Sequence, residues 1–132
     1  MVKSDTDHAR QPLAMADADQ TALTNMMNAQ SFPEQIFGFH AQQAIEKALK
    51  AWISVLRRPY PKTHDLSVLV GVLVDAGADL SSFLHFEDYT VFAVQYRYES
   101  YDAADEPLDR ALVLQETNGL LSHVREIISS AG

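Results

Sequence analysis

The feature that most restricts the fold of this chain is a long apolar stripe at helical spacing between residues 34 and 57. Its members recur every three or four residues, as one face of an α-helix requires, and two prolines follow closely enough to end the helix. Ser31 and Glu34 have the spacing of a capping box, with Pro33 placed in the first turn. We therefore expect a central helix of about 25 residues whose buried face comprises Phe37, Ala41, Ala44, Ala48, Trp52 and Val55.

Segments on either side of this helix also carry helical signals. A capping-box spacing predicts a first helix over residues 17–29. Thr63 or Asp65 is placed to cap a third helix, which Gly77 would end. Residues 66–74 are rich enough in valine to form a strand, but their flanks favour a helix and the chain offers no sheet partners. The buried side of this helix is expected to comprise Leu66, Leu69, Val70, Leu73 and Val74.

The C-terminal half predicts two more helices. One is rich in aromatic residues and covers residues 82–101, and the other covers residues 107–129 after an acidic turn, with Pro107 at its start. Residues 1–16 are polar and unpatterned and are expected to form a flexible arm, which leaves one domain over residues 17–132. About five helices with short loops and no strand predict an all-α, up-and-down helical bundle. The buried side of the last helix is expected to comprise Ala111, Leu114, Leu121, Val124 and Ile128.

Length and composition place the chain in a broad class. Its 132 residues, 47% of them hydrophobic, suit a single domain with one core. The first 20 residues contain acids and lack an apolar stretch, so they do not resemble a secretory signal. The absence of cysteine excludes disulfides and thiolate metal sites. A cytoplasmic location is therefore expected.

The charge of the chain is unevenly distributed. The formal net charge is −8, made up of −2 over residues 1–32, +3 over residues 33–62 and −9 over residues 63–132. An acidic protein does not attract nucleic acid through its overall field, since that affinity comes from neutralising phosphates. Contact with a nucleotide or RNA must then be local, and the basic segment 33–62 is the candidate. The alternative is that these basic side chains are simply solvated.

A polar face on the central helix is the first candidate binding site. At 100° per residue, His40, Gln43, Lys47 and Lys50 lie within about 80° of one another. A histidine, an amide and two ammonium groups on one wall suit a phosphate or the edge of a base. The alternative is the exposed polar face that most amphipathic helices carry.

Arg97 is the second candidate, because it lies beside Tyr96 and Tyr98 in an otherwise apolar segment. An arginine in such a setting must reach water, a carboxylate or a ligand phosphate, since burying it unpaired is costly. The 5 histidines have no metal-ligand spacing, so we expect neither a metal site nor a cofactor. His64 with Asp65 has the composition of an acid–base pair, but a capping aspartate beside a loop histidine explains it equally well.

The segment from Phe39 to Ala51, FHAQQAIEKALKA, closely resembles the signature second helix of HEPN-domain proteins (higher eukaryotes and prokaryotes nucleotide-binding). The resemblance continues at residues 62–66, at the residues around Arg97, and in an acidic turn that ends at Pro107. It implies a helical bundle, often a homodimer, that acts beside a minimal nucleotidyltransferase in a pair resembling toxin–antitoxin systems. The ligand-binding residues would then be His40, Gln43, Lys47, Lys50, Arg97 and Tyr98.

Two functions follow from this resemblance. Many HEPN proteins are metal-independent ribonucleases marked by an Arg and, four to six residues later, a His. No histidine follows Arg97 before His123, and the segment from Arg58 to His64 has that spacing only in a different, proline-rich loop. The first hypothesis is therefore a non-catalytic nucleotide- or RNA-binding module that acts with a nucleotidyltransferase partner. The alternative is a metal-independent endoribonuclease that uses Arg97 with a histidine brought in by the fold, either His64 or His40.

Overall fold

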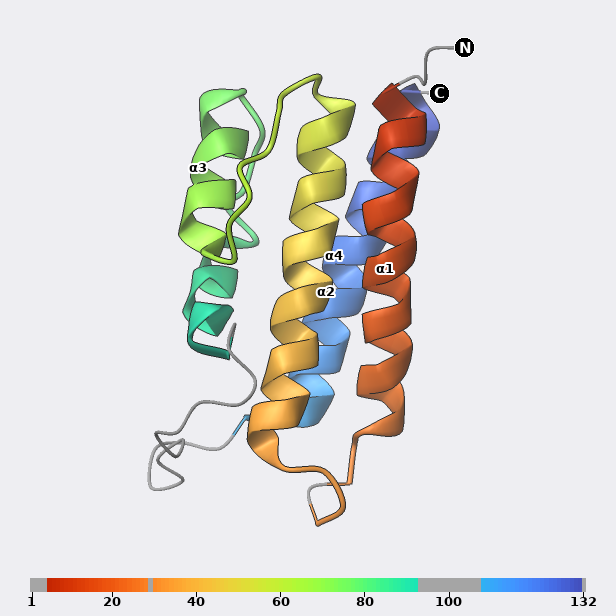
Figure 1. Cartoon of the computed structure of the whole chain (residues 1–132), viewed down its shortest axis with the longest axis vertical. Helices are drawn as coiled ribbons and strands as arrows, with labels where there is room; N and C mark the ends of the chain where they lie inside the picture. The colour runs from red at the N-terminus through yellow and green to blue at the C-terminus, as the bar shows by residue number, and fades with distance from the viewer. Residues whose placement is uncertain (1–4, 29, 93–107, 132) are drawn as a thin grey trace.

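The computed structural model describes residues 5–28, 30–92 and 108–131, and within these residues it is all-helical. The described elements are α1 (Asp5–Asn25), α2 (Glu34–Val55), α3 (Leu66–Asp75), the 3₁₀-helix η1 (Leu84–Phe92) and α4 (Arg110–Ala131). Figure 1 shows α1, α2 and α4 lying side by side as a bundle, with α3 and η1 along the other side of α2. The expectation of an all-α bundle of about five helices is confirmed.

Helix α2 is the centre of the molecule because it contacts every other described helix. Its expected stripe is buried except for the half-buried Val55, and Leu49 and Ile53 beside that stripe are buried too. Helix α1 contributes the small residues Ala9 and Ala16, both fully buried, to the core. Alanines at a helix contact let two backbones approach closely, so α1 packs along α2 more extensively than any other described pair.

The start of α2 differs from the expectation. Pro33 occupies the N-cap position and no side chain caps the helix, so the capping box expected from Ser31 does not form. The Glu34 side chain instead accepts a hydrogen bond from the backbone N–H of Leu108, at 2.6 Å. The Glu34 carboxylate therefore bonds to a residue distant in sequence and not to the backbone N–H at the start of its own helix, as a capping box would require.

Helix α1 begins at Asp5 rather than at residue 17, so the arm expected over residues 1–16 is helical from Asp5 onward. The sequence lacks an obvious apolar stripe here because alanine supplies much of the buried face. Pro12 lies inside the helix and is itself buried. Packing against α2 and α4 compensates for the hydrogen bond that a proline removes, as tertiary contacts supply most helix stability in proteins.

The next two elements confirm one expectation and correct another. Asp65 caps α3 by accepting from the backbone N–H of Ser67, and Gly77 follows its end with φ +89°, so the helix interpretation of residues 66–74 is confirmed. Val74, which was expected to be buried, is 51% exposed. The expected helix over residues 82–101 is a 3₁₀-helix up to Phe92, and its remainder lies outside the described residues.

Helix α4 closes the bundle against α1 and α2. It begins at Arg110, and Pro107, the expected start, lies outside the described residues. Of its expected buried face, Leu121 and Val124 are buried and Leu114 and Ile128 are half-buried, whereas Ala111 is exposed. The buried residues of this helix include Val113, Thr117, Leu120, Leu121 and Val124. Of the helices that the structure describes, none is long and apolar enough to cross a membrane.

The buried Arg110 joins the start of α4 to the loop between α1 and α2. Its guanidinium donates hydrogen bonds to the backbone carbonyls of Met26, at 2.7 Å, and Phe32, at 2.6 Å. The same group lies 4.8 Å from the centre of the Phe37 ring. One cation therefore satisfies a carbonyl just after α1 and another just before α2, and packs on the first turn of α2.

We predict that Arg110→Met lowers the free energy of unfolding by about 2–4 kcal/mol, because two carbonyls lose charged donors. Chemical denaturation followed by circular dichroism measures this change. Arg125→Met is the matched control, since Arg125 forms only an exposed ion pair with Asp17 and its loss should cost less than about 1 kcal/mol. Equal effects of the two substitutions would contradict the role given to Arg110.

A basic groove beside a buried polar network

A buried carboxylate organises the polar face of α2. The Glu46 side chain is only 2% exposed. One of its oxygens accepts from the Gln42 amide at 3.0 Å and lies 2.8 Å from Nδ1 of His64. The other oxygen accepts from the Lys50 ammonium at 3.0 Å. Three donors thus surround a charge that would be costly to bury alone.

These contacts decide the protonation of Glu46. Burial by itself raises the pKa of the carboxyl group, but hydrogen bonds from His64, Gln42 and Lys50, together with the charge of Lys50, outweigh it and lower the pKa below the ordinary 4.5. Glu46 is therefore ionised at neutral pH. An ionised carboxylate can only accept, so the His64 hydrogen facing it must lie on Nδ1.

The network continues along α2 towards α1. The Gln43 amide donates to the Gln42 side chain at 2.6 Å, and Gln43 in turn accepts from the Lys47 ammonium at 2.8 Å. Lys47 lies 3.7 Å from Asp19 of α1, whose other oxygen is 2.9 Å from Nδ1 of His40. The residues that the sequence placed on one face are therefore joined to one another through protein partners.

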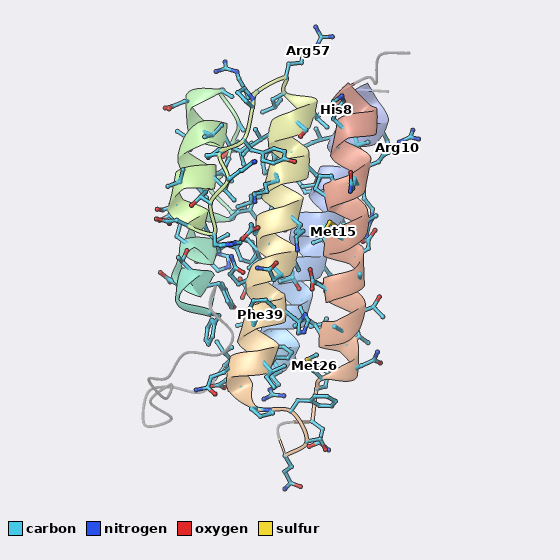
Figure 2. All side chains as sticks on the ribbon, viewed as in Figure 1. His8, Arg10, Met15, Met26, Phe39 and Arg57 are labelled. Carbon is cyan, nitrogen blue, oxygen red and sulfur yellow. The ribbon has the colours of Figure 1, made fainter. Side chains whose placement is uncertain are left out.

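A groove lies between α1 and the basic part of this network. Its volume is about 340 Å³, which is in the lower range of small-molecule sites. Lys47 and Lys50 of α2 line one side, and Tyr60 of the following linker lies 5.6 Å from the Lys50 ammonium, measured to the ring centre. Four residues of α1 line the other side: His8, Gln11, Pro12 and Met15. Figure 2 labels His8 and Met15.

A second, smaller pocket of about 230 Å³ adjoins the groove at His8, which lines both. Its other residues are Ser54, Arg57 and Arg58, at the end of α2. Figure 2 shows that His8 and Arg57 lie at the same end of the bundle. Among the side chains that the structure describes, which begin at His8, no acidic one lines either space, although the chain as a whole is acidic.

The structure brings together only part of the site expected from the sequence. Lys47 and Lys50 line the groove, whereas His40 and Gln43 belong to the network beside it. Arg97 and Tyr98 lie outside the described residues, so their role stays a prediction. His64, proposed for catalysis, is 67% exposed beside Glu46.

Sequence reasoning missed the residues of α1 and the linker that complete the groove. His8 and Gln11 lie in the segment expected to be an arm, so no helical face could be assigned to them. Tyr60 lies between two prolines, just after the basic end of the central helix. An aromatic residue in such a linker was the one sequence signal that could have identified it as part of the groove. Among the residues described, no group of three or more histidine and acidic side chains could hold a metal ion.

Comparison with known protein families agrees with this architecture. The model of the HEPN domain matches residues 10–131, nearly the whole chain. The chain therefore belongs to the HEPN domain family, and this membership supports a nucleotide- or RNA-related module. No curated protein and no solved structure shows significant similarity to it.

The lowered pKa of Glu46 predicts an acid-dependent loss of stability. A carboxylate whose folded pKa is depressed stabilises the fold above its unfolded pKa, and this contribution is lost as the pH falls from about 4.5 through the folded pKa. Glu46→Gln should lower the free energy of unfolding by about 2–4 kcal/mol at pH 7, because Lys50 loses its buried partner. The difference between wild type and variant should shrink below pH 4.5. Urea denaturation from pH 7 to pH 3 measures it, and a constant difference would be evidence against an ionised Glu46.

Proposed function

We propose that this protein is a non-catalytic nucleotide- or RNA-binding module that acts as a homodimer with a minimal nucleotidyltransferase, in a cytoplasmic pair resembling a toxin–antitoxin system. The observation that carries the binding function is the groove between α1 and α2, lined by Lys47 and Lys50 and, among the side chains described from His8 onward, by no acidic one. The partner and the pairing rest on the resemblance of the second helix to the HEPN signature.

The chemistry of the groove suits a phosphorylated ligand. Each lysine ammonium has three N–H donors. Lys50 donates one to Glu46, and Lys47 donates one to Gln43 and lies 3.7 Å from Asp19, so each ammonium keeps at least one donor for phosphate oxygens. The Glu46 and Gln43 contacts also hold the two ammonium groups in place, which reduces the entropy lost on binding.

Tyr60 adds a surface for the base. Its side chain is 39% exposed at the rim of the groove, and aromatic faces bind nucleobases by stacking without strong sequence preference. The His8 ring and the Gln11 amide on the opposite wall offer hydrogen bonds to ribose or base. The groove therefore combines the three kinds of contact that a nucleotide uses.

Binding without turnover is the test of this function. We expect the purified protein to bind a fluorescent ATP analogue and leave total RNA intact in the presence of EDTA. Lys47→Met should weaken ATP binding about tenfold, the usual effect of losing one charged hydrogen bond. Lys62→Met is the matched control, because it removes the same charge from an exposed residue that lines no described pocket. Equal effects of the two substitutions would place the binding site elsewhere.

The partner requires a separate measurement. Co-expression with a minimal nucleotidyltransferase encoded beside this gene should give a complex that stays together in size-exclusion chromatography. Light scattering of the protein alone should give the mass of a homodimer. A monomer that forms no complex with such an enzyme would contradict this part of the proposal.

One observation favours a second function, the metal-independent endoribonuclease. His64 is exposed, while its Nδ1 is held by the buried Glu46 carboxylate, which leaves Nε2 to exchange a proton with solvent or substrate. A carboxylate that orients a histidine in this way is a common arrangement for general acid–base catalysis. Arg97 would stabilise the charge that develops on the phosphate.

Cleavage of RNA in EDTA distinguishes the two functions. If the ribonuclease function holds, single-stranded RNA is cut, and His64→Ala and Arg97→Ala each reduce the rate about a hundredfold or more. Glu46→Gln should lower the rate and alter its dependence on pH, since Glu46 positions His64 and does not itself touch the substrate. Intact RNA with a folded wild-type protein would leave the non-catalytic module as the function.

A further inference from the structure

Helix α3 is apolar on all sides although it lies at the surface of the molecule. Of its 10 residues only Ser67 and Asp75 are polar, and the others are leucine, valine and glycine. A helix of this composition is normally buried on every side. One side of α3 packs on α2 and η1, and Figure 1 shows the helix at the edge of the bundle, away from α1 and α4. The described elements therefore leave its opposite side open.

The open side of α3 is centred on a glycine. Its exposed residues, here called the Gly71 face, are Ser67, Val68, Gly71, Val74 and Asp75. At 100° per residue they fall within an arc of about 120°, with Gly71 in the middle. Val68 is 42% exposed and Val74 is 51% exposed, and each lies three residues from the glycine. Two apolar side chains therefore flank a position that has none.

No contact within the described molecule requires a glycine at position 71. A Cβ atom added to Gly71 meets no atom within 4 Å, and the residue does not have a positive φ. Gly38 of α2 is different, because a Cβ atom there would lie 2.4 Å from the Phe92 ring. Glycine in the interior of a helix is destabilising relative to alanine, and its use there is to let another backbone approach closely. The position of Gly71 therefore points to a contact from outside the chain.

The charge around the Gly71 face indicates the kind of partner. Between Lys62 and Arg97 the sequence contains five acids and no lysine or arginine. Two of these acids, Asp65 and Asp75, lie at opposite ends of α3, and both are exposed. The Gly71 face is therefore apolar in the middle and acidic at its ends. The five acids are Asp65, Asp75, Asp79, Glu87 and Asp88.

This charge excludes three kinds of occupant. The acids repel the phosphates of a nucleic acid and the anionic surface of a membrane. A second copy packed face to face across Gly71 would bring Asp65 and Asp75 of one molecule towards the same carboxylates of the other, and like charges at an interface are unfavourable. A partner with basic side chains on both sides of an apolar surface is complementary to the face.

We propose that the Gly71 face of α3 is a docking surface for a basic amphipathic helix of a partner protein. The partner helix crosses α3 at Gly71, where the missing side chain lets the two backbones approach, and its apolar stripe packs on Val68 and Val74. Lysine or arginine side chains beside that stripe reach Asp65 and Asp75. This inference is independent of the binding groove, because none of these residues lines it.

The test uses a synthetic amphipathic helix as the probe. The peptide has about five turns, with a stripe of alanine and leucine and with lysine on both sides of that stripe. We expect the fluorescein-labelled peptide to bind with a Kd of about 10 μM, as is usual for a small interface. The same peptide with glutamate in place of every lysine should bind at least about tenfold more weakly. Amide chemical shifts should change mainly at residues 67–75.

Gly71→Leu is the decisive substitution. It fills the space between the two valines, so binding of the lysine peptide should weaken about tenfold or more. The melting temperature should not fall, because leucine favours a helix and its Cβ atom meets no other atom within 4 Å. Gly119→Leu is the matched control, since it adds the same side chain at an exposed glycine of α4 whose Cβ atom would also meet nothing, and it should leave binding unchanged.

A second pair of variants tests the charge. Asp75→Asn removes an acid from the Gly71 face and should weaken binding of the lysine peptide about threefold, with a smaller dependence on salt. Glu126→Gln removes an exposed acid from α4 and should change neither quantity.

The outcomes are distinct. Selective loss of binding in Gly71→Leu, together with a preference for the lysine peptide over the glutamate peptide, supports the docking surface. A folded protein that binds neither peptide, or equal effects of Gly71→Leu and Gly119→Leu, overturns it. Light scattering tests for a second copy on the same face. A dimer that Gly71→Leu separates into monomers would make this face an interface between copies of the chain and would overturn the basic partner.

Discussion

The carboxylate of Glu46, buried in the middle of α2, determines where the polar residues of this protein lie. A charge in this position requires donors on every side, and the chain supplies them from α2 itself and from the linker that follows it. The linker is thereby held against α2, with His64 at one end of the contact and Tyr60 near Lys50. The hydrogen bonds that stabilise the buried Glu46 carboxylate therefore also hold Lys50 and His64 in place beside the groove.

The groove gathers basic side chains on a protein that is acidic overall. Overall charge controls encounters at a distance, but affinity at contact depends on the groups within a few ångströms, because salt screens exposed charges beyond about 10 Å. Here the basic residues belong to a short stretch of sequence that folds into one helix and its terminal turn. The acidic surplus lies mainly in later residues, and it discourages non-specific attachment to long nucleic acids.

The fold was largely predictable where a single segment carries its own signal. The apolar stripe of α2 and the paired signals of Asp65 and Gly77 around α3 each identify a helix from local residues. Prediction failed where the decisive contact is distant in sequence. The helical state of residues 5–16 depends on alanines packed against α2, and Glu34 binds the N–H of Leu108 instead of closing a cap.

The candidate site was likewise predictable only where its residues lie on a single helix. Helical geometry alone places Lys47 and Lys50 on one face, because residues three apart in a helix are neighbours. It could not show that Asp19 of α1 would lie beside His40, or that His8 would form the opposite wall. Those relations depend on how two helices are set against each other, which short-range sequence patterns do not encode.

Pro12 has a consequence for the groove. A proline inside a helix has no N–H, so it cannot bond the carbonyl four residues earlier, and in α1 that carbonyl belongs to His8. Both residues line the groove. The turn of α1 that borders the groove therefore contains a carbonyl without its usual i+4 donor. If the groove binds a nucleotide as proposed, a ribose hydroxyl or a base amine has the donor that this carbonyl lacks.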